Sequence, residues 1–301
     1  MELVDKRPEN LPPDNSRMET ISFKSPADGC EVKVDVYSPS TKTGKSLPLV
    51  FGPHPISWSA GDDYHGGMPG LMREYHRGYY SMPEKYAVII ALPHGHEHRE
   101  QYTSLAGPGQ IADMAHLIDG LDEFGYTVDK ERVYACGLSM GAQEALVLAG
   151  KHPDRIAAIC VFNPIVDLAI WYEDLTNMDV PEIKEYDTAS RIANEVGGLP
   201  GDVTELYAER SANNYIEGLA QVPTLMYWSE LDFIVPRQIS HHAMLLYRMI
   251  KLIDLNCPIA EYNHTKIHGR IELDKLTRWR LHEWCDYELA LRWLLNHKKE
   301  Q

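Results

Sequence analysis

One serine stands between two glycines in Gly137-Leu138-Ser139-Met140-Gly141. An apolar run enters this pentapeptide, and a run rich in Ala and Leu leaves it. The pentapeptide alone recurs by chance, but this setting predicts a tight strand-to-helix turn whose glycines let neighbouring backbone approach without a clashing Cβ. Such a turn holds the hydroxyl above a sheet, near a helix N-terminus that favours negative charge. We therefore expect Ser139 to be a nucleophile.

A serine nucleophile needs a base to take its proton and an acid to orient that base. With a nucleophile turn of this kind, the acid follows in chain order and the histidine comes last. The run "VPTLMYWSELDFIVP" offers an apolar strand followed by Asp232. Asp232 leads directly into an apolar turn, which favours it over the nearby Glu230. We expect Asp232 to be the acid.

The base must lie at a loop end from which it can reach both the serine and the acid. His268 fits this requirement best, because it follows the strand-like run "PIAEYN" in a loop and precedes Gly269. Two alternatives stay open. His264 lies on or just after the same run, and His282 is expected in the first turn of a closing helix.

A tetrahedral oxyanion needs backbone N–H donors. One donor is expected at Met140, the residue after the nucleophile, and the second in the loop after an earlier buried strand. That loop contains His54-Pro55-Ile56, and proline has no N–H. The second donor is therefore expected at Ile56 or Ser57. Losing one such donor typically lowers the rate about 10²- to 10³-fold.

Strand-like and helix-like runs alternate along most of the chain. Two strands joined by a turn at Pro26–Gly29 are expected first, in "METISFKSPADGCEVKVDVYSPS". Further strands are expected in "LPLVFGP", "YAVIIALP", "RVYACGL", "RIAAICVFNP", "VPTLMYWS" and "PIAEYN", and helices in "GQIADMAHLIDGLDEFG", "GAQEALVLAGKH", "SHHAMLLYRMIKLI" and "RLHEWCDYELALRWLLNHKK". This alternation predicts an α/β fold with a mostly parallel sheet and helices on both faces.

A loosely ordered polar arm is expected over residues 1–17, followed by one domain over residues 18–301. Two insertions, at about 56–85 and 165–221, interrupt the alternation. Long excursions in such a sheet gather near the carboxyl ends of the strands, where ligands bind. The insertions are therefore expected to form a cap or lid at the mouth of the site.

Aromatic residues in these insertions are candidates for the wall of a substrate pocket. They are Trp58 in the first insertion and Trp171 and Tyr172 in the second. A neighbouring carboxylate, Glu173 or Asp174, could meet a cationic group. An equal alternative for the run "AIWYEDL" is an amphipathic helix that covers the sheet.

Three histidines, His94, His96 and His98, alternate in "LPHGHEHREQY". Alternate residues of an extended segment point the same way, so imidazoles at this spacing can ligate zinc or a similar metal. No further ligand set is apparent in the sequence, and a polar loop is favoured. We expect neither a metal nor an organic cofactor.

The composition is that of a globular protein, 44% hydrophobic and 24% charged, with a formal net charge of −15. This acidity disfavours nucleic acids and anionic membranes as partners. The five cysteines are scattered without a Cys-x-x-Cys pair, and neither a signal peptide nor a membrane span is evident. We expect a cytoplasmic location and leave the oligomeric state open, a homo-oligomer included.

With turn, acid and histidine in this order, the chain resembles the α/β-hydrolase superfamily. Within it, the chain looks most like the catalytic domain of the prolyl oligopeptidase and acylaminoacyl-peptidase group and its esterase relatives. The resemblance covers nearly the whole chain after Met18, and "GLSMGA", "HPDRIAAICVFNPIVD", "YAERSANNYIEGLAQVPTLMYWSELDFIVP" and "KIHGR" carry it. It implies the α/β-hydrolase fold, with Ser139, Asp232 and His268 as nucleophile, acid and base.

Three departures from that group bear on the substrate. No segment of β-propeller size precedes the hydrolase region, Trp228-Ser229 replaces a His-Gly before the acid loop, and the stretch at 56–85 is longer than usual. We therefore expect a serine hydrolase that cleaves a carboxylic ester of a small or medium substrate through an acyl-enzyme. A peptidase or acyl-amino-acid hydrolase acting on short peptides is the alternative within the same chemistry. A catalytically silent binding protein of this fold is the alternative from another class.

Overall fold

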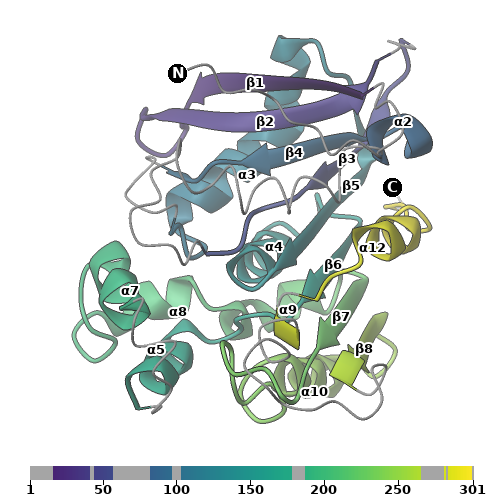
Figure 1. Cartoon of the computed structure of the whole chain (residues 1–301). Helices are drawn as coiled ribbons and strands as arrows, with labels where there is room; N and C mark the ends of the chain where they lie inside the picture. The colour runs from purple at the N-terminus through teal and green to yellow at the C-terminus, as the bar shows by residue number, and fades with distance from the viewer. Residues whose placement is uncertain are drawn as a thin grey trace, which may run out of the picture.

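A mostly parallel sheet runs through the molecule (Figure 1). The computed structural model describes residues 16–40, 44–56, 82–96, 103–177, 187–265, 281–282 and 284–299. Within them, eight strands follow the order β1-β2-β4-β3-β5-β6-β7-β8. The β1–β2 and β2–β4 pairs are antiparallel, and the other five neighbouring pairs are parallel. The predicted fold class is confirmed.

The strands coincide with the expected apolar runs. Their bounds are β1 Ser16–Lys24, β2 Glu31–Pro39, β3 Leu47–Phe51, β4 Ile89–Pro93, β5 Val128–Leu138, β6 Ala158–Phe162, β7 Thr224–Trp228 and β8 Ile259–Asn263. Every residue of β4, β6 and β7 is buried, as expected for central parallel strands covered on both faces. Strand β8 lies at the end of the sheet order and is only partly buried, because it has a neighbour on one side alone among the described strands.

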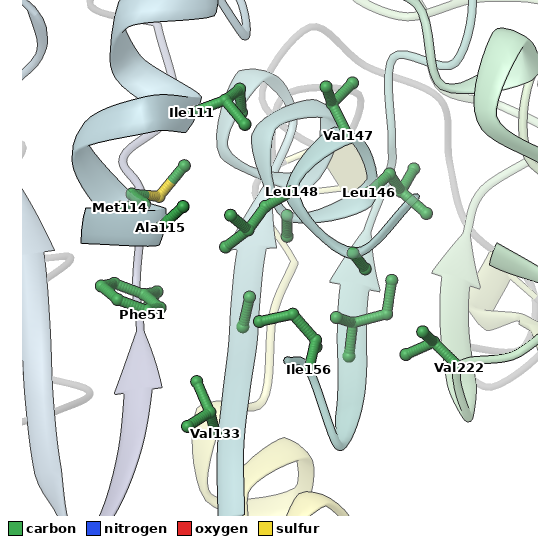
Figure 2. Packing of buried hydrophobic residues seen from close by; sticks show 14 of the residues in the cluster. Phe51, Ile111, Met114, Ala115, Val133, Leu146, Val147, Leu148, Ile156 and Val222 are labelled. Carbon is green, nitrogen blue, oxygen red and sulfur yellow. The ribbon is translucent and has the colours of Figure 1, made fainter. Parts of the chain in front are cut away.

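Helices pack on both faces of the sheet. One face carries α3 Pro108–Gly120, α4 Met140–Lys151, α9 Ile216–Leu219 and α10 Ala243–Ile253. Figure 2 shows this core, with Met114 and Leu148 from the helices and Phe51 and Val133 from the strands. The other face carries α2 Met82–Tyr86 and α12 Tyr287–Leu294. Within the described residues, no helix is long and apolar enough to cross a membrane.

The second insertion is largely helical where the structure describes it. It contains α5 Leu168–Asn177, α7 Thr188–Val196, α8 Thr204–Glu209 and the 3₁₀ turn η4 Ala212–Tyr215. Apolar side chains of α5, α7 and α8 join a third buried cluster. The predicted N-terminal arm up to residue 15 and residues 57–81 of the first insertion lie outside the described residues.

The closing helix is shorter than the sequence predicts. Helix α12 begins at Tyr287 because Asp286 caps it, its carboxylate accepting a 2.9 Å hydrogen bond from the Leu289 N–H. Residues 284–286 before it are not helical. Leu281 and His282 are themselves helical, but residues 284–286 separate them from α12, so His282 lies ahead of α12 and not in its first turn.

A buried carboxylate lies on α4, the helix that follows the Ser139 turn. Glu144 is buried, and it accepts hydrogen bonds from the Ser104 hydroxyl and, at 3.1 Å, from the Gln110 amide. Its burial raises the pKa of Glu144 to about 7, a shift that these hydrogen bonds only partly oppose. In the folded protein Glu144 therefore binds a proton at a pH at which it would be ionised in the unfolded chain.

We predict that Glu144→Gln removes a pH-dependent destabilisation. The raised pKa means that the folded state loses stability as pH rises from about 4.5 through about 7, by on the order of 3 kcal/mol. In the variant, the Gln110 amide can flip, because its Oε1 has no hydrogen-bond partner among the described residues. Urea unfolding at pH 5 and pH 8 checks this, and the variant should gain stability relative to wild type only at the higher pH.

Glu217→Gln, at an exposed position on α9, is the control. An identical pH dependence in wild type and Glu144→Gln would contradict the prediction.

Candidate active site

Ser139 forms the turn between β5 and α4. Its backbone is left-handed, with φ 57° and ψ −116°, a conformation that costs a non-glycine residue about 1–3 kcal/mol. Two hydrogen bonds of 3.0 Å hold the turn, from the Ser139 N–H to the Phe162 carbonyl and from the Gln143 N–H to the Ser139 carbonyl. The side chain is buried, and its Oγ makes no hydrogen bond to any described residue. A serine that lies in a strained turn and whose hydroxyl makes no hydrogen bond to a described residue is suited to act as a nucleophile.

The two flanking glycines have no room for a side chain. A Cβ on Gly141 would lie 2.0 Å from the Pro53 carbonyl oxygen, and one on Gly137 would lie 2.3 Å from the Gly141 carbonyl. The loop after β3 is thus pressed against the first turn of α4. The same close approach brings Ile56 into one buried apolar cluster with Met140.

The predicted oxyanion donors are Met140 and Ile56. Neither backbone N–H donates a hydrogen bond within the part of the chain that the structure describes. Both residues are fully buried, so a carbonyl oxygen bound by them would be shielded from water. Their role as donors stays a prediction, and Ser57, the other candidate, lies outside the described residues.

Asp232 and His282 form a buried pair. The Nδ1 of His282 lies 3.0 Å and 2.9 Å from the two carboxylate oxygens of Asp232. Asp232 also accepts hydrogen bonds from the Ile234 N–H at 2.9 Å and the Val235 N–H at 3.1 Å. The two side chains are 0% and 4% exposed, for Asp232 and His282 respectively. A carboxylate fixed in this way holds the imidazole with Nδ1 protonated, which leaves Nε2 able to accept a proton.

The structure describes two of the three candidate bases, His282 and His264. His282 contacts Asp232. His264 is buried, stacks on Trp284 at a ring-centroid distance of 4.7 Å and lies 3.3 Å from the Asn163 side-chain oxygen through Nε2. His268, which the sequence favours, lies outside the described residues.

The buried Asn163 ties the acid and histidine segments together. Its amide nitrogen donates to the carbonyls of Leu281 at 3.0 Å and His282 at 2.7 Å, and its oxygen accepts the Ser229 N–H at 2.9 Å. Its oxygen is also the atom that faces His264. Asn163 itself is left-handed, with φ 43°, a conformation that asparagine tolerates better than most residues. Sequence reasoning did not single it out; an asparagine directly after a buried strand was the one available signal.

Three neighbouring strand ends carry the site. Strands β5, β6 and β7 are adjacent and parallel, so Ser139, Asn163 and the Asp232 loop follow at the same edge of the sheet. The Asn163 N–H donates to the Tyr227 carbonyl at 2.8 Å, which fixes it at this edge. Two strand spacings separate β5 from β7, about 10 Å, and Asn163 holds the His282 backbone above the strand between them.

The second insertion is anchored to the acid loop. Trp171 is fully buried, and its indole N–H donates to the Ile234 carbonyl at 2.7 Å. Asp174 pairs with Arg237 of the same loop, with 2.9 Å between Arg237 Nε and the carboxylate. These contacts place α5 against the loop after Asp232 and give Asp174 a cationic partner within the chain, while the role of Trp171 in a pocket wall stays a prediction.

Of the other two predicted pocket residues, the structure describes only Tyr172. Tyr172 is half-buried and packs edge-on against Tyr207, with 6.2 Å between ring centroids. Trp58 lies outside the described residues. A buried apolar cluster next to the Ser139 turn includes Ile56, Met140 and the three residues directly after Asp232, Phe233, Ile234 and Val235.

Comparison with known proteins identifies the family. The sequence profile of the prolyl oligopeptidase family matches residues 85–257, more than half of the chain. The chain belongs to the prolyl oligopeptidase family. This family of α/β-hydrolases contains serine hydrolases, and the resemblance inferred from the sequence is confirmed. No curated protein matches the chain in sequence.

Solved structures share the fold of this prolyl oligopeptidase family member at low sequence identity. An acylaminoacyl peptidase from Pyrococcus horikoshii has a TM-score of 0.62 and 18% identity, over 95% of this chain and 42% of that one. An S-formylglutathione hydrolase from Agrobacterium tumefaciens has a TM-score of 0.55 and 16% identity, over 95% and 97% of the two chains. An esterase from Pyrobaculum calidifontis has a TM-score of 0.56 and 17% identity, over 93% and 84%. The chain thus spans less than half the length of the peptidase, and these likenesses show the α/β-hydrolase fold.

We predict that Asn163→Asp destabilises the protein by roughly 2–4 kcal/mol, because it leaves the Leu281 and His282 carbonyls without a donor in a buried site. Urea unfolding at pH 8 measures this. Asn214→Asp is the matched control, since the Asn214 amide also donates to a backbone carbonyl, that of Ala208, but at an exposed position. Equal small losses in both variants would contradict a special role for Asn163.

Proposed function

We propose that this prolyl oligopeptidase family member is a serine hydrolase in which Ser139, Asp232 and His282 form the catalytic triad. The observation that carries the proposal is the buried Asp232–His282 pair at the sheet edge where the strained Ser139 turn lies. Chain order, Ser then Asp then His, agrees with the order in α/β-hydrolases.

The proposed reaction runs through an acyl-enzyme. Ser139 Oγ attacks the substrate carbonyl carbon while His282 Nε2 takes the hydroxyl proton, and Asp232 stabilises the imidazolium that forms. Met140 and Ile56 N–H groups bind the oxyanion. The intermediate collapses as His282 gives the proton to the leaving alcohol. Water, deprotonated by His282, then releases the acid and regenerates Ser139.

His282 is proposed as the base in place of His268. The support is its direct contact with Asp232 and the two hydrogen bonds by which Asn163 holds the carbonyls of His282 and its neighbour. An orienting acid and a fixed backbone are what a catalytic imidazole requires. His268 stays the rival that mutagenesis must exclude.

A carboxylic ester of a small or medium acyl group is the proposed substrate. The described cluster beside Ser139 is apolar, formed by side chains such as Ile56, Met140, Phe233 and Val235. Asp174 of the insertion already forms an ion pair with Arg237. An uncharged acyl chain suits such a lining, because it buries apolar surface without leaving a charge unpaired. Short peptides and acyl-amino acids are the second candidate, since acylaminoacyl peptidases share the fold.

We predict that a fluorophosphonate forms one covalent adduct with the wild-type protein and none with Ser139→Ala. Intact mass measured on both proteins under the same conditions checks this. Ser240→Ala, which removes an exposed hydroxyl, should label like wild type. A wild-type protein that is folded but takes up no adduct would overturn the enzyme proposal and favour a binding protein of hydrolase fold.

We predict that His282→Gln lowers kcat on p-nitrophenyl esters by about 10²- to 10⁴-fold, the contribution of a general base. His268→Gln and the exposed His116→Gln should retain activity within a few-fold. A large loss in His268→Gln with activity preserved in His282→Gln would reverse the assignment. Circular dichroism of each variant separates loss of the base from loss of the fold.

Substrate class is tested on the wild-type enzyme. Acyl esters of two to eight carbons and acyl-aminoacyl or short peptide p-nitroanilides are compared by kcat/KM. Larger values for the esters support the proposal, and larger values for the anilides make the protein a peptidase with the same triad.

A further inference from the structure

A second group of reactive side chains lies outside the triad. Asp28 and Cys30 come from the turn between β1 and β2, and His96 follows β4. We call Asp28, Cys30 and His96 the hairpin cluster. Strands β2 and β4 are adjacent, so the fold joins residues that are 66 positions apart in sequence. In the sheet order, β3 lies between β4 and the β5 strand that carries Ser139.

The ligand atoms of the hairpin cluster are close enough to share one ion. His96 Nε2 is 3.2 Å from Asp28 Oδ2, Cys30 Sγ is 3.9 Å from His96 Nε2, and the three atoms lie within 4.8 Å of one another. For a tetrahedral zinc site, bond lengths of about 2.0–2.3 Å imply about 3.3 Å between nitrogen and oxygen ligands and about 3.6 Å between sulfur and nitrogen. Sγ is equally far from both ring nitrogens, so Cys30 must rotate toward Nε2 when an ion binds.

A buried carboxylate orients the imidazole of the hairpin cluster. The Nδ1 of His96 donates to Asp113 at 2.7 Å, and Asp113 also accepts the Ser25 hydroxyl at 2.6 Å. Asp113 is 1% exposed, so its position is fixed by the surrounding core. A carboxylate on one ring nitrogen, with the other nitrogen turned to the ligand group, is the usual second shell of a zinc-bound histidine.

Gly109 packs against the His96 ring without blocking the position in front of Nε2 in the ring plane. A Cβ on Gly109 would lie 2.4–2.5 Å from three atoms at the tip of the His96 ring. Equal distances to these three atoms place Gly109 against the face of the ring and not in front of Nε2. The in-plane direction points toward Asp28, whose side chain is 40% exposed, so an ion and a water ligand can enter from solvent.

We propose that the hairpin cluster is a binding site for a divalent transition metal of the zinc class. Asp28, Cys30 and His96 are the protein ligands, water is the fourth, and Asp113 is the orienting carboxylate. One sulfur, one nitrogen and one oxygen donor favour zinc over magnesium or calcium, which take oxygen ligands. The ion links the β1–β2 hairpin to the segment between β4 and α3, so its role is structural.

The sequence alone argued against this site. His96 belongs to the alternating "HGHEH" run, and that run offers no further ligand set nearby. The hairpin supplies two ligands from 66 and 68 positions earlier, and α3 supplies the orienting Asp113.

The test uses the full chain, treated with a chelator and a phosphine reductant and then titrated with Co²⁺ and Zn²⁺. Co²⁺ should give a thiolate-to-metal charge-transfer band that saturates at one equivalent and is displaced by Zn²⁺. Cys30→Ser should abolish the band, and Asp113→Asn should weaken metal affinity about 10- to 100-fold. Cys285→Ser, which alters a half-buried cysteine elsewhere, is the matched control and should bind like wild type.

Thermal unfolding gives a second readout. Added Zn²⁺ should raise the Tm of wild type and of Cys285→Ser but not of Cys30→Ser or His96→Gln, because a ligand that binds only the folded state stabilises it. Absence of the charge-transfer band in folded wild type, or one equivalent of binding that survives Cys30→Ser, would overturn the proposal. Ser139→Ala should bind zinc normally, so this outcome does not depend on the proposed hydrolase activity.

Discussion

The site depends on one close backbone contact, in which the Pro53 carbonyl of the loop after β3 meets Gly141 in the first turn of α4 where no Cβ fits. This contact sets the position of α4 relative to the sheet, and with it the turn at Ser139. It also brings the loop that carries Ile56 beside Met140. The proposed nucleophile and its two expected oxyanion donors are thus positioned by backbone packing and not by flexible side chains, which is what preorganised stabilisation of a developing charge requires.

Asn163 connects two further segments of the site at the same edge of the sheet. One amide contacts the acid loop through Ser229 and the histidine segment through two carbonyls. Since these segments come from distant parts of the chain, their hydrogen bonds form only when β6 and β7 are paired and the segment with Leu281 and His282 has docked. Assembly of the acid–histidine pair is therefore coupled to formation of the sheet edge.

The elements that obey local rules could be predicted from the sequence. The strands, the helices α3, α4 and α10, the strand-to-helix turn at Ser139 and the loop position of Asp232 after β7 all follow from periodicity, glycine spacing and chain order. The partner of Asp232 could not be predicted in this way. "KIHGR" has the motif, whereas His282 is distinguished by a tertiary contact, and the helix expected to contain it starts only at Tyr287 because of the Asp286 cap.

Non-local contacts account for the other gaps. Asn163 has no motif, since its value lies in the four groups it reaches from other elements. The hairpin cluster joins residues far apart in sequence, so local spacing around His96 could not reveal it. In both cases the missing information is which strands are neighbours, and sheet order is the least local property of the chain.

For the proposed hydrolase, the anchoring of α5 to the loop after Asp232 has a consequence for how specificity could change. Trp171 and Asp174 form hydrogen bonds to the segment that follows Asp232, so a substitution that shifts α5 also displaces the proposed acid. In the proposed mechanism, acyl selectivity and proton transfer are therefore coupled. New specificities would arise more readily from side chains that point off α5 without moving it than from changes in its length or tilt.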